Sequence, residues 1–335
     1  MHEAAQHTDE TELDGPLLFG RVLDGRGGAR RIDWAQARSW QPTAPHEVLW
    51  LHLCRTVEGL EQWLEDMGIP EPTAEFLTGN DKRPRAFREG VALVANLRGI
   101  NFNPGAEPED MIAFQVWSDG PRVFTLRRRR LQSPRDVLAL LDAGRGPKDS
   151  GQVITQLIEA VSIRMSSSIV DMNDAIDAME EAGADAETED QLARIATIRR
   201  NCLGLQRHMA PQHEALEAIV RDAPGWFEDD DRREIAESID RLRRYLEDIN
   251  ISKESALVLQ DDIRVRALAR SERTNYLLTI VAAIFLPLGF LTGLLGINVG
   301  GMPGVDDSHA FWFVVALCGA ILGMQVVLFW KWKWL

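Results

Sequence analysis

The residues best suited to chemistry lie near the C-terminus, where Gly296-Ile297-Asn298 closes a long apolar run. An asparagine at the edge of such a run, beside glycines, is more than helix packing requires. A carboxamide oxygen repeated around a symmetry axis could replace outer-shell water of a hydrated cation without stripping its inner water. The motif therefore points to selection of a cation, and Pro303-Gly304 is predicted to end the helix.

Acidic and imidazole groups near this motif, and upstream of it, offer further contacts for cations. Asp306, Asp307 and His309 follow the motif and could attract a cation from outside, although His309 could equally be an ordinary interfacial residue. Upstream, four acids recur at spacings of three and four and so share one helical face: Asp171, Asp174, Asp177 and Glu181. This acidic stripe could attract cations or could simply be a solvated face.

Other chemistry finds little support in the sequence. The three cysteines are far apart, and His208 and His213 stand five residues apart, so no tight metal site, disulfide framework or resident cofactor is expected. Neither a nucleotide loop nor a nucleophile with a base is present, which excludes the common enzyme classes. The net charge of −14 argues against nucleic acid as a partner, and the basic run 127–130 is interpreted as solvent-facing or paired with acids rather than as an anion site.

Two apolar segments must position the motif. Residues 276–295 and 311–330 are each twenty residues long, and a helix of about that length crosses a bilayer core. A short Gly/Pro/Asp loop separates them, so we expect a transmembrane hairpin: pore helix 275–298, external loop 299–310, second span 311–330 and a tail of tryptophans and lysines. A buried helical hairpin in a soluble core is the alternative.

The flanking charges predict the orientation of this hairpin. Four arginines precede the first span, two lysines follow the second, and the loop carries no Lys or Arg. The positive-inside rule then places both termini in the cytoplasm and the loop outside, with the chain in the cytoplasmic (inner) membrane. The polar, acidic N-terminus does not read as a signal peptide.

The preceding residues should form a large cytosolic body. Residues 1–148 mix strand-like runs (46–53, 90–99, 111–117 and 122–129) with short helical stretches (57–68 and 133–144), which predicts an α/β/α layer domain. A Ser133 cap is expected at the second helical stretch. Residues 149–274 read as long helices near 152–182, 188–222 and 229–273, the last continuing into the membrane. A helix that long needs partners, so an oligomer is expected.

One face of the first span has the composition of a pore wall. At helical spacing it carries a polar entrance, apolar positions and then glycines: Asn275, Leu278, Ala282, Leu286, Gly289, Gly293 and Gly296. Small residues let several helices approach one axis closely. Simple helix packing without a pore is the alternative.

With these features together, the chain resembles CorA-type divalent-cation transporters. Two spans at the C-terminus, a Gly-x-Asn at the end of the first and a Lys/Trp tail carry the resemblance. The Gly296-Ile297-Asn298 variant, the following Gly-Gly-Met-Pro-Gly and the stretch 83–111 look like the ZntB branch of that family.

The resemblance implies an α+β membrane protein that assembles as a funnel-shaped homopentamer, with a cytosolic α/β/α domain, a long helical stalk and an outer ring of second spans. It also implies zinc transport, with proton coupling proposed for the branch. Ile297 replaces the methionine of the main branch and Gly304 stands where the magnesium branch has glutamate, so magnesium selectivity does not carry over. A Mg²⁺ or Co²⁺ channel of the same fold, and a non-transporting membrane-anchored sensor or scaffold, are the alternative functions.

Overall fold

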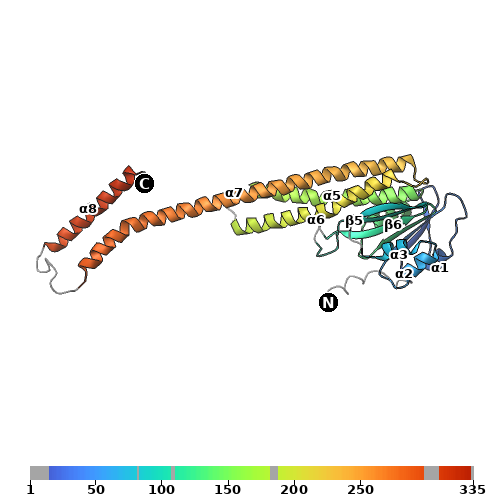
Figure 1. Ribbon diagram of the computed structural model, residues 1–335, viewed down its shortest axis with the longest axis horizontal. Helices are drawn as coiled ribbons and strands as arrows, with labels where there is room; N and C mark the ends of the chain where they lie inside the picture. The colour runs from blue at the N-terminus through green and yellow to red at the C-terminus, as the bar shows by residue number, and fades with distance from the viewer. Residues whose placement is uncertain (1–14, 81–82, 107–109, 182–187, 298–308, 333–335) are drawn as a thin grey trace. The chain divides into compact units, whose positions relative to one another are not determined.

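The computed structural model describes residues 15–80, 83–106, 110–181, 188–297 and 309–332. The chain divides into two compact units, Met1–Leu259 and Gln260–Leu335. Asn298, Asp306 and Asp307, together with the Pro303-Gly304 turn, lie outside the described residues. The first unit holds a sheet and a helical bundle, and the second holds two apolar helical segments (Figure 1).

A seven-stranded mixed sheet organises the first unit. Its strands are β1 (Leu17–Leu23), β2 (Ala29–Arg31), β3 (Val48–Cys54), β4 (Arg85–Glu89), β5 (Ala92–Gly99), β6 (Ile112–Ser118) and β7 (Arg122–Arg127). They lie in the order β2-β1-β3-β7-β6-β5-β4. Only the central β3–β7 pair is parallel among the described pairings, with Leu51 opposite Phe124. The predicted β6–β7 hairpin is confirmed, and the Asp119 side chain accepts a hydrogen bond from the Arg122 amide at 3.1 Å.

Helices cover both faces of this sheet, which confirms the expected layers. On one face lie α1 (Trp34–Arg38), α2 (Leu60–Asp66) and α3 (Glu71–Thr78), and their side chains pack on sheet residues such as Leu51 and Phe124. On the other face, α4 (Ser133–Asp142) and the start of α5 (Ser150–Glu181) pack on Trp50 and Val123. Because successive side chains of a strand point to opposite faces, the one sheet contributes to two separate apolar cores.

The start of α4 corrects one sequence-based prediction. Gln132, rather than Ser133, is the N-cap, and it makes no side-chain capping bond. Ser133 is the first helical residue and is buried, so its hydroxyl is not placed to cap the helix. Pro134 occupies the second helical position, where its missing N–H costs nothing because that donor has no intrahelical partner.

Three long helices complete the first unit: α5, α6 (Thr188–Arg221) and the N-terminal part of α7 (Asp229–Leu295). Both ends of α5 and α6 and the start of α7 agree with the predicted helices to within two residues, and α7 continues into the apolar segment as expected. Polar contacts join them inside the bundle. Ser252 of α7 donates to Asn173 of α5 at 2.5 Å, and Gln206 of α6 donates to Asn250 of α7 at 3.2 Å.

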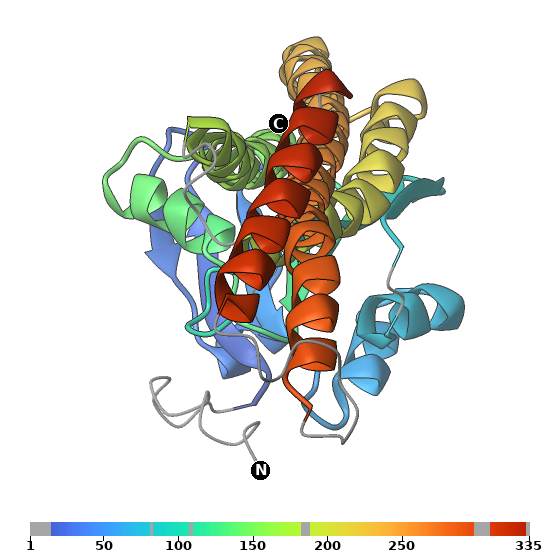
Figure 2. The same cartoon turned by 90° about the vertical axis from the view of Figure 1, so that its left-hand side faces the viewer.

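The second unit contains the end of α7 and α8 (Ala310–Lys331), which lie side by side in both views (Figures 1 and 2). By length and composition, α5, α7 and α8 could each cross a membrane. The most apolar stretch of α5 is 56% buried within the protein, against 6% for α7 and 0% for α8. The apolar side of α5 is therefore accounted for by the sheet and the bundle, whereas the apolar surfaces of α7 and α8 face outward.

Candidate ion pathway

The apolar part of α7 has two different faces. One faces α8 and contains the partly or fully buried residues Ile280, Ala283, Ile284, Leu288 and Leu291. The matching face of α8 consists of Val314, Cys318, Ile321, Gln325 and Phe329, at spacings of three and four. These two stripes explain how the hairpin packs, and they leave the rest of α7 uncovered within one chain.

The residues predicted to line a pore lie on the uncovered side of α7. All of them are exposed in the single chain: Asn275, Leu278, Ala282, Leu286, Gly289, Gly293 and Gly296. Leu278 is 62% and Leu286 is 72% exposed. The packing of α8 thus does not use this face, which remains available to other copies of α7.

Two glycines on this face, Gly289 and Gly293, are not explained by contacts within the chain. A side chain added at Gly289 or Gly293 would meet no atom within 4 Å outside the local helix backbone. Neither position therefore needs to be glycine for α8 to pack. Their small size would allow another helix to approach α7 closely.

The outer end of α7 corrects a second prediction. The helix ends at Leu295, before the Pro303-Gly304 turn that was expected to end it, and the Gly296 amide donates to the Gly293 carbonyl at 3.2 Å. Three glycines within eight residues weaken the helix here, because glycine has a low helix propensity. Gly296 and Ile297 thus lie just beyond the helix, and Ile297 is 49% exposed. The position of Asn298 is not described.

His309 is the described part of the predicted external cation-attracting group. It is the N-cap of α8, and its backbone carbonyl accepts a hydrogen bond from the Phe313 amide at 3.1 Å. The residue therefore marks the point at which the chain enters the second apolar helix.

The acidic stripe lies on the outer side of the helical bundle. Asp171, Asp174, Asp177 and Glu181 are all exposed on α5. The opposite side of the helix is buried through Met165, Ile169, Met172, Ile176 and Met179. Within the described part of the chain, no three His, Cys, Asp or Glu side chains gather closely enough to hold a metal ion. The stripe thus has the geometry of a solvated face.

The two histidines of α6 do not form a common site. Burial, reinforced by Arg98 and Arg207, lowers the pKa of His208 to about 4, so this imidazole is neutral at physiological pH. His213 instead has its Nδ1 3.8 Å from the Glu217 carboxylate. The two histidines therefore have different surroundings within the bundle.

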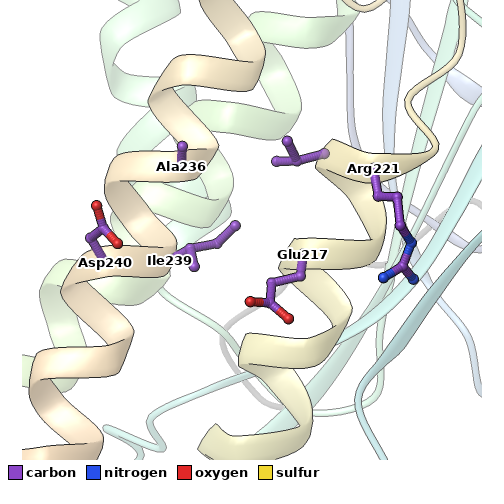
Figure 3. A pocket seen from close by; sticks show the side chains of 6 residues that line it. Glu217, Arg221, Ala236, Ile239 and Asp240 are labelled. Carbon is purple, nitrogen blue, oxygen red and sulfur yellow. The ribbon is translucent and has the colours of Figure 1, made fainter.

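A groove of about 420 Å³ lies between α6 and α7 in the first unit. Figure 3 shows Ala236, Ile239 and Asp240 on one helix opposite Glu217 and Arg221 on the other. The groove is open and includes none of the residues that the sequence analysis selected. Its two carboxylates and one guanidinium are not arranged as a set of metal ligands.

One buried carboxyl lies where α5 and α7 begin. Asp231 is 3% exposed, and its carboxylate accepts a hydrogen bond from the Glu228 amide at 2.9 Å. Burial, together with the nearby charges of Asp149, Glu234 and Glu228, raises the pKa of Asp231 to about 6, against the lowering effect of the Glu228 amide. This carboxyl therefore titrates close to neutral pH.

The family model for the "CorA-like Mg2+ transporter protein" matches residues 45–331, most of the chain. The chain belongs to the CorA family. A relative from Pseudomonas aeruginosa, the "Divalent cation transporter CmaX", is 40% identical over 95% of this chain and 97% of its own. The "Zinc transport protein ZntB" of Yersinia enterocolitica is 34% identical over 92% and 93% of the two chains.

Solved structures agree with this assignment. The structure of full-length CmaX is 39% identical and superposes with a TM-score of 0.83, covering 95% of this chain and 98% of CmaX. The CorA magnesium transporter from Methanocaldococcus jannaschii shares only 14% identity yet gives a TM-score of 0.76 over 94% and 98% of the two chains, which shows a common fold. The expected CorA-type resemblance and its ZntB branch are confirmed. The chain is a divalent-cation transporter of the CorA family and not an enzyme.

One polar residue of this CorA-family hairpin, Gln325, was not among the candidates selected from the sequence. It is the only carboxamide residue in α8, and it lies on the side that faces α7. Its amide nitrogen donates to the Ala283 carbonyl of α7 at 3.0 Å. A single glutamine within an apolar span, opposite a span that contains a proline, is the signal that could have drawn attention to it.

Proposed function

We propose that this CorA-family chain transports Zn²⁺ across the cytoplasmic (inner) membrane through the central pore of a homopentamer. The observation that carries the choice of zinc is the similarity to ZntB proteins over nearly the whole chain. Ile297 within Gly296-Ile297-Asn298 accords with that branch of the family.

The pore is proposed to form from the exposed face of α7. Five copies of Gly289 and Gly293 would face one axis, and the absence of contacts at these glycines leaves room for close approach. Because α8 packs on the other side of α7, it would form an outer ring between α7 and the lipid. At the outer end, Gly296 and Ile297 would present Asn298, whose carboxamide oxygens would contact the hydrated ion.

Exposed apolar residues on α7 support assembly. Ile251, Val258 and Val265 stand seven residues apart and are 62%, 70% and 63% exposed. A seven-residue repeat of apolar side chains is the pattern by which helices associate along their length. Burial of this stripe, together with the glycine-containing face, would make the homopentamer rather than the single chain the stable unit.

The charges that flank the apolar helices support an orientation with both termini in the cytoplasm. Arg264, Arg266, Arg270 and Arg273 are exposed on α7 before its apolar part, and Lys331 ends α8. His309 would then lie outside with Asp306 and Asp307, where acidic groups attract cations. A membrane-impermeant thiol reagent should label the His309→Cys variant in intact cells. Labelling only after lysis would show that residue 309 lies in the cytoplasm and would contradict the proposed orientation.

A weakly binding pathway is compatible with zinc as cargo. A transporter must release its ion, so binding of a hydrated ion by carboxamide oxygens serves better than a tight Cys/His site. Proton coupling is the further implication of the ZntB branch. The proteoliposome experiment described below, performed with and without a pH gradient, tests it.

A Mg²⁺ or Co²⁺ channel is the second candidate function. The description of the matching family model, which names Mg²⁺, favours it, and the name of the CmaX relative specifies only divalent cations. A non-transporting sensor or scaffold was a third interpretation of the sequence, and membership of a transporter family counts against it.

The decisive experiment is ion uptake into proteoliposomes, with zinc and magnesium competing. Zinc flux should exceed magnesium flux in the wild type, and Asn298→Ala should reduce zinc flux because the selecting oxygens are gone. Val327→Ala is the matched control, since Val327 is 63% exposed on α8 away from α7. Magnesium flux above zinc flux would favour the second candidate, and equal flux in wild type and Asn298→Ala would remove Asn298 from the mechanism.

A further inference from the structure

The backbone of α7 is interrupted at Pro287, inside its apolar part. Proline has no N–H, so the carbonyl four residues earlier, that of Ala283, lacks its normal helical partner. A carbonyl left without a donor is costly in the membrane core, because lipid offers no hydrogen bond in place of the one that water would supply. Something else must satisfy Ala283 if the helix is to continue to Leu295.

The structure supplies the missing donor from α8. The side-chain amide of Gln325 donates to the Ala283 carbonyl at 3.0 Å. Both residues belong to the second unit and lie on the faces that α7 and α8 turn toward each other. This bond is thus placed at the one carbonyl that the proline leaves open, rather than at an arbitrary point along the hairpin.

Within the described part of the chain, the bond to Ala283 is the one hydrogen bond that holds the Gln325 side chain. The Oε1 atom of Gln325 is buried and has no hydrogen-bond partner among the described residues. Nothing on that side holds the amide, so rotation of one side chain releases Ala283. The residues next to Pro287 on the exposed face of α7 are Leu286 and Gly289, which belong to the proposed pore wall. A change of bend at Pro287 would therefore move that wall.

We propose that Gln325 is a positioning residue that latches α8 to the proline break of α7. With the latch closed, α8 holds α7 in one bend; with it open, α7 bends or rotates about Pro287 and shifts Leu286 and Gly289. The role of the latch in ion flow rests on the proposed function, because it requires α7 to line the pathway. The latch itself requires only the hairpin.

A double-mutant cycle on the full-length protein tests this proposal. Gln325→Met removes the donor with little change in volume, and Pro287→Ala restores the N–H that Ala283 lacks. Pro287→Leu does the same and serves if the alanine variant does not fold. Ile321→Met is the matched control, because Ile321 lies on the same face of α8 but has no donor. The thermal unfolding midpoint in detergent and ion flux in proteoliposomes are measured for each variant.

Gln325→Met should lower both the unfolding midpoint and the flux when Pro287 is present, the flux by about threefold to tenfold, as expected for one interhelical hydrogen bond. In the Pro287→Ala background the same substitution should change neither, because the donor has become redundant. Ile321→Met should show no such dependence on Pro287.

Equal effects of Gln325→Met in both backgrounds would overturn the proposal and leave Gln325 as a packing residue. The two readouts separate this proposal from the proposed function. If the wild type moved no divalent ion, transport would be refuted, whereas coupling in the unfolding midpoint would still establish the latch. If flux is normal but neither readout shows coupling, the latch alone is refuted.

Discussion

At the scale of single residues, Asp231 is the group whose surroundings most clearly set its chemistry. It is the third residue of α7, where the free amides of the first helical turn stabilise a carboxylate. However, it is also buried against the start of α5, so close to Gly151 that a side chain there would overlap its carboxylate. The helix start thus favours an ionised carboxylate at this position, whereas burial favours the protonated carboxyl.

This conflict predicts a pH dependence of stability. The pKa of Asp231 is about 6 in the folded protein against 3.8 ordinarily, so the folded state binds more protons between these values. Its favourable contribution is complete below about pH 4 and is lost as the pH rises through about 6. Asp231→Asn should raise the free energy of unfolding at pH 7 by about 1–3 kcal/mol.

Thermal unfolding of the full-length protein in detergent from pH 4 to pH 8 measures this effect. The wild type should lose stability relative to Asp231→Asn as the pH rises. Parallel curves for the two proteins would show that Asp231 does not titrate in this range. Asp149, Glu228 and Glu234 surround this position in both proteins, so the difference between the two curves isolates the Asp231 carboxyl.

At the scale of elements, the division of α7 into two faces is the feature on which the proposed function depends. One face packs on α8 through apolar side chains, and the other carries Gly289 and Gly293, which no contact within the chain explains. In lipid, apolar surface alone gives helices little reason to associate, so close approach through small residues becomes the main attraction. The glycine-containing face should therefore be sensitive to added bulk, while the lipid side of α8 should not.

Gly293→Leu should accordingly block close approach of α7 helices and reduce ion flux about tenfold or more. Gly323→Leu is the matched control, since Gly323 in α8 also has no neighbour within 4 Å of an added side chain. Flux in proteoliposomes and the oligomer distribution by native mass spectrometry check both. If Gly323→Leu reduced flux as strongly as Gly293→Leu, α7 would have no special place in the pathway.

At the scale of the whole molecule, the single chain leaves too much apolar surface uncovered to be the working unit. The stripe formed by Ile251, Val258 and Val265 is exposed on a part of α7 that precedes the apolar segment, where lipid cannot cover it. Exposed apolar stripes at heptad spacing are normally covered by other helices. Assembly of several copies explains this stripe and the glycine face together.

Val258→Lys should therefore shift the protein toward smaller species, because an ammonium group would be buried in the interface without a partner. Val91→Lys is the control, as Val91 is 65% exposed at the turn between β4 and β5. Light scattering of the detergent-solubilised protein measures the assembly. An unchanged mass for Val258→Lys would exclude this stripe from the interface.

The sequence by itself determined the long helices and the two apolar helical segments. Helix periodicity and the length of an apolar run are local properties, so α5, α6, α7 and α8 could be placed within a few residues. The buried strands β3, β5, β6 and β7 were also recognisable, because their apolar content is high. The exposed face of α7 could be proposed from spacing alone, and its motif indicated the family.

The tertiary structure alone decided the features that depend on distant partners. Strands β2 and β4 and helices α1 and α3 are short and rich in charged or small residues, so pairing and packing rather than propensity define them. The parallel pairing of β3 with β7 joins residues more than seventy positions apart. The bond from Gln325 to Ala283 could not be read from either helix, because a proline opens the carbonyl and a different helix provides the donor.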